Sequence, residues 1–209
     1  MAKAGGMRHW AALKRTLTVP DFPNLKPLAK PTDETLDRYE TTTGLRLPHS
    51  YRSFIKVFGP GKLAWDYQIA APGFSEQGWV VDLVKFNAVP HQALREKRVL
   101  RQFKNPAQVQ RLVFFCRPGD GDLVGWDPED VRDRRRHEYG IYGWGREDAL
   151  GFVAASFTEF IEDICLSEAN LLLTPEQVAE LGTRREFLPE CDLRPSKRAA
   201  KAGRTRRCT

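Results

Sequence analysis

The sequence of 209 residues predicts an α+β fold in which helices pack on one face of a single antiparallel or mixed sheet. Two amphipathic helices come first, several short apolar segments typical of strands follow, and a third amphipathic helix comes after them. Helices and strands that are grouped in this way, rather than alternating one by one, favour a sheet with segregated helices. With 41% hydrophobic residues, the chain can form a packed core.

The first two helices should form a helical hairpin. The first covers 33–43, with Thr32 or Asp33 as its N-cap and Gly44 as its stop. Pro48 suits the first turn of the second helix, and Gly59 suits its end. The second helix carries one apolar stripe with i, i+3, i+4 and i+7 spacing, formed by Tyr51, Phe54, Ile55 and Phe58.

The middle of the chain should supply the sheet. The polar, Arg-rich residues 85–103 are predicted to be helical in part, and residues 128–138 to be a charged loop or a single helical turn. The turn-forming residues 118–121 indicate a hairpin between their neighbours. Strand-like residues recur in five segments: 62–71, 111–117, 122–126, 139–144 and 150–154.

A capping box opens the last helix of the predicted domain. Ser156 suits the N-cap and Glu159 the N3 position, so that the two satisfy backbone donors reciprocally. A second box at 174–177 predicts a short helix that ends near Gly182. We therefore divide the chain into a loose basic extension, a globular domain, a short C-terminal helix and a disordered basic tail, with the ranges 1–24, 25–170, 171–190 and 191–209.

The net charge of +6 is unevenly distributed. Residues 194–209 carry seven basic residues and no acid, and residues 1–20 carry four and no acid, so 21–193 carry −5. An acidic body favours a basic partner through electrostatic steering. The basic tail suggests weak, non-specific contact with nucleic acid through Arg198, Lys201, Arg204, Arg206 and Arg207.

Several classes of protein are disfavoured. No apolar run approaches the roughly 20 residues that span a bilayer, and the N-terminus does not resemble a secretory signal, so we expect a cytoplasmic protein without membrane contact. The histidines and cysteines show no spacing typical of metal ligands, and no glycine-rich segment matches a phosphate loop. We therefore expect no catalytic residue, no metal, no cofactor and no enzymatic activity.

Three segments together carry a resemblance to a known family. They are GLRLPHSYRSFIKVFGPG at 44–61, PGDGDLVGWD at 118–127 and SFTEFIEDIC at 156–165. Their order and spacing over 32–166 resemble the SUKH superfamily, the Smi/Knr cell-wall synthesis regulator-like domain. The stretch between the strand hairpin and the last helix is longer and richer in arginine than the family pattern, which puts a family-based interface there in doubt.

The resemblance implies a non-enzymatic domain that binds another protein. Bacterial members of this type look like immunity proteins that neutralise a cognate polymorphic toxin, frequently a nuclease, and this is the leading interpretation. An intracellular adapter or scaffold of the Smi/Knr type is the alternative. A nucleic-acid-associated protein that acts through its basic termini is the third possibility.

An acidic group around the predicted hairpin is the candidate partner-binding site. Carboxylates there could receive the basic nucleic-acid-binding face of a nuclease, with two tryptophans as aromatic anchors. The alternatives are that the carboxylates form a solvated turn and that both tryptophans belong to the core. The candidate residues are Asp120, Asp122, Trp126, Asp127, Glu129, Asp130 and Trp144.

Overall fold

The computed structural model describes residues 3–20, 25–119, 121–145, 150–167 and 185–192. Its helices are α1 (Met7–Thr16), α2 (Asp33–Thr43), α3 (His49–Phe58), α4 (Leu83–Ala93), α5 (Lys97–Leu100), α6 (Pro106–Arg111), α7 (Phe157–Glu159) and the π-helix η1 (Phe160–Cys165). Its strands are β1 (Lys26–Pro27), β2 (Gly61–Leu63), β3 (Tyr67–Ile69), β4 (Val113–Arg117), β5 (Leu123–Asp133), β6 (Glu138–Trp144), β7 (Leu150–Ala154), β8 (Phe187–Pro189) and β9 (Cys191–Asp192).

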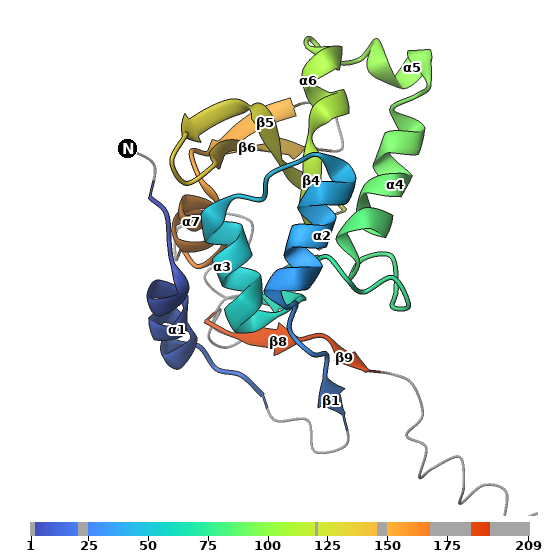
Figure 1. Cartoon of the computed structure of the whole chain (residues 1–209). Coiled ribbons are helices and arrows are strands. Elements are labelled where there is room, and N and C mark those ends of the chain that lie inside the picture. Colours follow the sequence, from blue (N-terminus) through green and yellow to red (C-terminus); the bar gives the residue numbers. More distant parts are fainter. Residues whose placement is uncertain (1–2, 21–24, 120, 146–149, 168–184, 193–209) are drawn as a thin grey trace, which may run out of the picture.

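Seven strands form one antiparallel sheet in the order β7-β6-β5-β4-β3-β2-β8. Figure 1 labels β4, β5, β6 and β8 of this sheet. Strands β1 and β9 form a separate antiparallel pair. The predicted α+β class, with an antiparallel sheet and helices packed on it, is confirmed.

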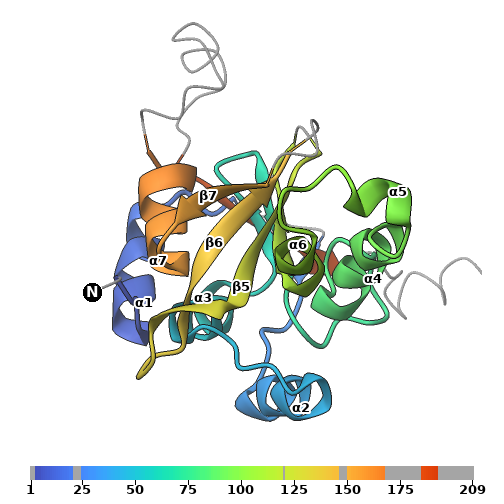
Figure 2. The same ribbon diagram turned by 90° about the horizontal axis from the view of Figure 1, so that it is seen from above.

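Helices lie on both faces of the sheet, not only on the one face that the sequence predicted. Figure 2 shows α1, α3 and α7 on one side of strands β5 to β7 and α4, α5 and α6 on the other. Phe115 of β4 packs on Phe157 of α7, with ring centroids 5.3 Å apart, whereas its neighbour Phe114 packs on His91 of α4 at 5.7 Å. Consecutive buried apolar residues in β4 require a cover on both sides.

The predicted helical hairpin is confirmed in its caps and its buried stripe. The Thr32 hydroxyl accepts a hydrogen bond from the Thr35 N–H and so caps α2, which Gly44 ends in the left-handed conformation with φ of 70°. Helix α3 ends at Gly59, whose φ is 79°. All four residues of the apolar stripe of α3 are buried, and this stripe lines the core between α1, α7 and the sheet.

The N-cap of the predicted capping box is confirmed, and the reciprocal bond from the N3 side chain is made one residue earlier than the N-cap. The Ser156 hydroxyl accepts from the Glu159 N–H at 3.2 Å, and the Glu159 carboxylate accepts from the Ala155 N–H at 3.1 Å. The helix continues as the π-helix η1, so its Phe160 and Ile161 still reach the core.

The N-terminal segment is not the loose extension that its basic composition predicted. Residues 7–16 form α1, and Trp10 on this helix is completely buried. The Trp10 ring lies 5.2 Å from Phe54 of α3, and its Nε1 donates to the Ser50 carbonyl at 2.9 Å. A single large aromatic side chain holds α1 in place, and an apolar face this small gives little periodicity in the sequence.

The C-terminal part of the described chain completes the sheet. The helix predicted over 171–190 and the disorder predicted from 191 are wrong where the structure describes them, because β8 pairs with β2 and β9 pairs with β1. Phe187 of β8 is 1% exposed and packs on Phe58 of α3 at 4.9 Å. The predicted helix at 174–182 lies outside the described residues.

The charged stretch 128–138 is not the loop or helical turn that was predicted. Strand β5 continues to Asp133, residues 134–137 form the turn, and β6 begins at Glu138. Because β5 and β6 pair antiparallel along this stretch, its backbone is hydrogen-bonded. The charged side chains of 129–136 are exposed or half-buried, whereas Glu138 is buried. The helical character predicted for 85–103 is found in α4 and α5.

Candidate functional site

The predicted acidic group does not form one open surface, because Asp127 is buried. Its side chain is 1% exposed and is held by Arg111, which donates from Nε at 2.7 Å and from Nη2 at 2.8 Å. Gln108 Nε2 and the Glu129 N–H donate at 3.0 Å each. A carboxylate with four donors in this geometry fixes α6 against β5 and offers little to a partner.

The pKa of Asp127 reflects its burial and its hydrogen bonds. Burial acts to raise the pKa, but the hydrogen bonds from Arg111, the Glu129 N–H and Gln108 outweigh burial, so the pKa of this carboxyl lies below its usual value. Asp127 is therefore an ionised structural residue.

The two tryptophans belong to the interior rather than to an exposed anchor. Trp126 is 0% exposed and stacks on Phe115 at 5.2 Å. Trp144 is half-buried between Phe103, at 5.5 Å, and Phe114, at 5.9 Å. The alternative in which both tryptophans are core residues is the one that the packing favours.

Of the remaining candidates, two share a surface. Glu129 and Asp130 lie near the end of β5, and the Glu129 side chain is 72% exposed. Asp122 is half-buried just before the start of that strand. Asp120 and the tail residues proposed for nucleic-acid contact lie outside the described residues, so the tail contact stays a prediction.

A compact polar and aromatic surface surrounds Asp130, and we call it the β5–β7 face: Glu129, Asp130, Arg132, Tyr142 and Phe152. Asp130 Oδ2 accepts from Arg132 Nη2 at 2.7 Å and from the Tyr142 hydroxyl at 2.9 Å. The Tyr142 and Phe152 rings meet edge to face at 5.6 Å, because their positions are paired between β6 and β7. The Arg132 guanidinium lies 5.1 Å from the centre of the Phe152 ring.

The Asp130 carboxylate organises the electrostatics of this face. Burial, followed by the hydrogen bond to Asp130, raises the pKa of Tyr142, which keeps its hydroxyl protonated. The hydrogen bond to Asp130 also raises the pKa of Arg132. The Tyr142 hydroxyl and the Arg132 guanidinium therefore stay protonated at neutral pH and can both donate to Asp130. The exposed Phe152 ring lies beside a fixed arginine and a fixed carboxylate.

This arrangement can bind a protein. An aromatic ring that is 54% exposed, flanked by arginine and tyrosine, has the composition of an interface hot spot. In the described ranges β7 is the outer strand of the sheet, so the face lies at an accessible edge. Within those same ranges, no group of three or more His, Cys, Asp or Glu side chains could hold a metal ion.

The sequence predicted two of the five residues of this surface. Glu129 and Asp130 were candidates because of their charge, whereas Arg132 was only part of the charged stretch 128–138, and Tyr142 and Phe152 were not candidates. Those two residues come together only through the register of β6 with β7. The only sign of this surface in the sequence was that Tyr142 and Trp144 alternate along one strand and so lie on the same side of the sheet. That spacing does not reveal which side of the sheet stays uncovered.

A comparison with models of protein families matches residues 30–163 to the SMI1 / KNR4 family (SUKH-1). No curated protein and no solved structure matched. The match runs from α2 into η1 and leaves α1, β1, β8 and β9 outside it. Among the described helices, none combines the length and the apolar character that crossing a membrane requires.

Proposed function

The chain belongs to the SMI1 / KNR4 family (SUKH-1), and from this membership we propose that it is a non-enzymatic domain that binds another protein. Its partner in this proposal is a cognate polymorphic toxin of the nuclease type, which it neutralises in the cytoplasm as an immunity protein. The alternative is an intracellular adapter that binds a partner without inhibiting it.

The β5–β7 face is the observation that carries the proposal. It combines an exposed aromatic ring with an arginine and a tyrosine whose positions Asp130 fixes through hydrogen bonds of 2.7 and 2.9 Å. Side chains that are already ordered before binding lose less conformational entropy in a complex. Residues of these types supply most of the binding energy in protein interfaces.

The charge of the body supports a basic partner. Residues 21–193 carry a net charge of −5. On the β5–β7 face Glu129 pairs with Arg111 at 3.3 Å and Asp130 with Arg132 at 2.7 Å, so the negative charge belongs to the body as a whole. A nuclease must present cationic side chains to phosphates, so its substrate-binding surface is complementary to an acidic body. Blocking that surface would inhibit the toxin without any chemistry by the inhibitor.

Co-expression tests the proposal directly. The toxin domain encoded by a neighbouring gene should stop cell growth when expressed alone, and growth should resume when this chain is co-expressed. The purified proteins should form a complex, and nuclease activity should fall at a 1:1 ratio. A stable complex without inhibition would favour the adapter, and the absence of both binding and protection would contradict the immunity function.

Substitution of the exposed ring tests the surface. Phe152→Ala should weaken toxin binding by about 30-fold or more, because an aromatic hot spot contributes about 2 kcal/mol or more. Isothermal titration calorimetry measures the change. Trp79→Ala is the matched control, since Trp79 is 39% exposed and also lies under an arginine, Arg117, at 5.2 Å. Equal affinities of the two variants would move the interface away from the β5–β7 face.

A further inference from the structure

The segment around α5 has a charge opposite to that of the rest of the body. Residues 95–104 contain five cationic side chains and one carboxylate, a net charge of +4, although the whole range 21–193 carries −5. We call the five cations the α5 knob: Arg95, Lys97, Arg98, Arg101 and Lys104. All five are exposed.

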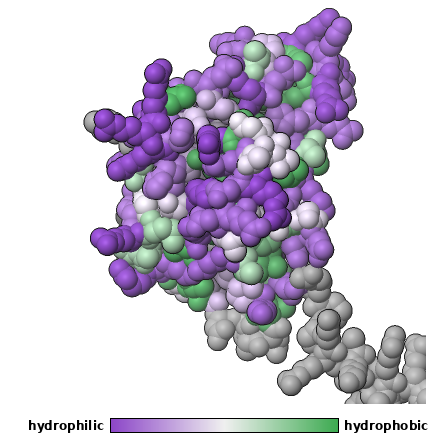
Figure 3. Space-filling view, in the orientation of Figure 1, coloured by the Kyte–Doolittle hydropathy of each residue, from purple (hydrophilic) through white to green (hydrophobic). Residues whose placement is uncertain are grey.

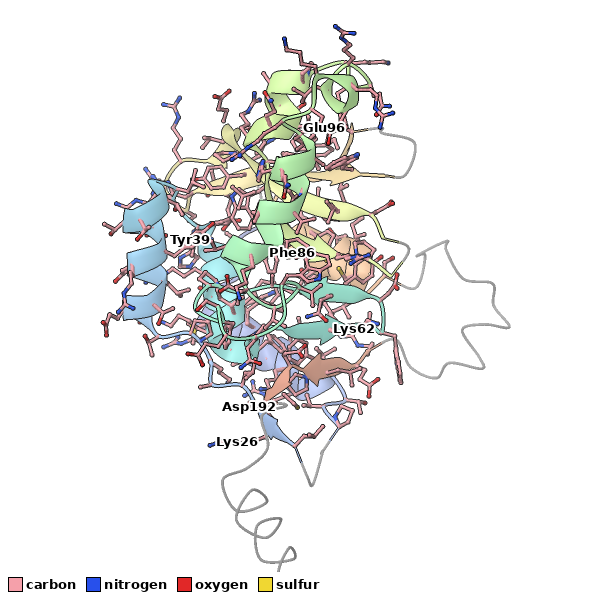
Figure 4. The ribbon with its side chains drawn as sticks, turned by 90° about the vertical axis from the view of Figure 1, so that its right-hand side faces the viewer. Lys26, Tyr39, Lys62, Phe86, Glu96 and Asp192 are labelled. Carbon is pink, nitrogen blue, oxygen red and sulfur yellow. The ribbon has the colours of Figure 1, made fainter. Side chains whose placement is uncertain are left out.

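The packing of this segment directs the cations outward. Leu94 is 1% exposed and Phe103 is 6% exposed, and Val99 and Leu100 pack against the core. Figure 4 shows the nitrogen-tipped side chains around Glu96 projecting from the end of the molecule opposite to Lys26 and Asp192. In Figure 3 the surface over α5, at the upper right, is mostly hydrophilic. The apolar residues fix the segment, and the cations form its outer surface.

Within the described ranges, none of the five cations forms an ion pair within 4.0 Å. Helix α2 shows the contrasting arrangement, because its Asp33 and Asp37 accept from Arg52 of α3 at 2.9 and 2.7 Å. Like charges so close together destabilise the folded chain. The knob therefore has no evident role in stability.

The positive potential reaches a neighbouring group. His91 at the end of α4 donates a hydrogen bond from Nε2 to the Leu112 carbonyl oxygen, at 3.0 Å. Burial lowers the pKa of His91, and the charge of Arg95 lowers it further.

We propose that the α5 knob is a binding site for the phosphate backbone of nucleic acid. Contacts to phosphates require clustered, accessible cations and no apolar anchor, and they are largely independent of base sequence. A protein interface would require a buried aromatic or aliphatic anchor, and none of the exposed large hydrophobic side chains of the described residues lies within 95–104. This composition favours nucleic acid over an acidic protein.

The site is separate from the proposed toxin-binding surface in its charge and its chemistry. The β5–β7 face combines an aromatic ring with carboxylates and with Arg132, which pairs with Asp130, whereas the knob offers cations alone. Nucleic acid bound at α5 would hold the protein beside the substrate of a nuclease, which raises the chance of meeting that enzyme. The two sites can therefore be tested independently.

Fluorescence anisotropy of the full chain with labelled single-stranded RNA and duplex DNA tests the knob, between about 50 and 200 mM salt. The variant Lys97→Glu, Arg98→Glu, Arg101→Glu should bind at least about tenfold more weakly at the lower salt concentration. The slope of log K against log salt should fall in magnitude by about 2.7 for duplex DNA and by about 2 for single-stranded RNA, because each phosphate contact contributes about 0.9 and about 0.7 respectively. The control Arg8→Glu, Arg15→Glu, Lys26→Glu makes the same change in net charge on α1 and β1.

The tail must be separated from the knob. A full-length chain with Arg198, Lys201, Arg204, Arg206 and Arg207 changed to glutamine should still lose affinity when the knob is reversed. Matching thermal melts by circular dichroism would show that all variants are folded. Equal losses of affinity in the knob and control variants would overturn the proposal. Binding of polyglutamate that depends on the knob, without binding of either oligonucleotide, would also overturn it and would assign the knob to an acidic protein.

Discussion

Replacing Trp10 with alanine is expected to lower the free energy of unfolding by about 3–5 kcal/mol, the usual cost of removing a buried tryptophan. The side chain is 0% exposed and lies edge to face with Phe54 at 5.2 Å and with Phe157 at 6.1 Å. Its removal also leaves the Ser50 carbonyl without the hydrogen bond from Nε1. Urea denaturation followed by circular dichroism measures the change.

A position on the same helix supplies the control. Met7→Ala removes a side chain that is 44% exposed, so its effect should stay within about 0.5 kcal/mol. Trp10→Phe keeps most of the apolar contact but loses the donor, and it should fall between the two. If Trp10→Ala unfolds at the wild-type urea concentration, α1 does not pack on the domain as described.

The importance of Trp10 changes how the boundaries of the domain should be drawn. The residues matched by the family model begin at 30, yet α1 buries a face of α3 inside that range. The Gly5 N–H also donates to the Thr158 hydroxyl at 2.7 Å, which ties the start of the chain to α7. A chain cut at the family boundary would expose Phe54 and Phe157 to water, and exposed aromatic clusters favour aggregation.

Local signals account for the elements that the sequence predicted correctly. Thr32, Gly44, Ser156 and Glu159 act within a few residues of themselves, so their roles as caps could be inferred without the fold. The stripe of α3 follows from helical periodicity alone. The α+β class then follows from the order of these elements.

Long-range contacts account for what the sequence could not reveal. Trp10 is surrounded by charged and small residues, and its partners lie 40 residues or more along the chain. Phe187 occupies a short segment whose strand character depends on pairing with β2. In the sequence, Asp127 does not differ from the neighbouring carboxylates. It is buried because α6 places Arg111 and Gln108 against it. The exposed Phe152 could be chosen only after the register of β7 was known.

One buried carboxyl makes stability dependent on pH. Glu138 is 0% exposed at the start of β6, where its Oε1 accepts from the Ser50 N–H at 2.8 Å and its Oε2 from the Ser50 hydroxyl at 2.6 Å. These bonds join the β5–β6 hairpin, which carries most of the β5–β7 face, to the first turn of α3. Burial outweighs the hydrogen bonds and raises the pKa of Glu138 to about 7.

Because the folded pKa lies above the unfolded value of 4.5, the folded chain holds the proton more tightly. The stabilisation is complete below pH 4.5, and it is lost as the pH rises toward 7. The contribution lost is about 3 kcal/mol, at about 1.4 kcal/mol for each pH unit. Glu138→Gln should not show this decline. If the variant is less stable than the wild type at pH 4.5, the difference between their free energies of unfolding should become smaller as the pH rises to 8. Urea denaturation over this pH range measures that difference.

The comparison of the wild type with Glu138→Gln separates the effect of Glu138 from that of other groups that titrate in the same pH range. Burial lowers the pKa of His49 and His91, and such groups reduce stability as the pH falls, which is the opposite direction. Both histidines are present in wild type and variant, so their contribution cancels in the difference. Glu129→Gln, at a side chain that is 72% exposed, should keep the wild-type profile. Parallel profiles for wild type and Glu138→Gln would mean that Glu138 is ionised in the folded protein throughout this range, and that its bonds to Ser50 are then those of a carboxylate.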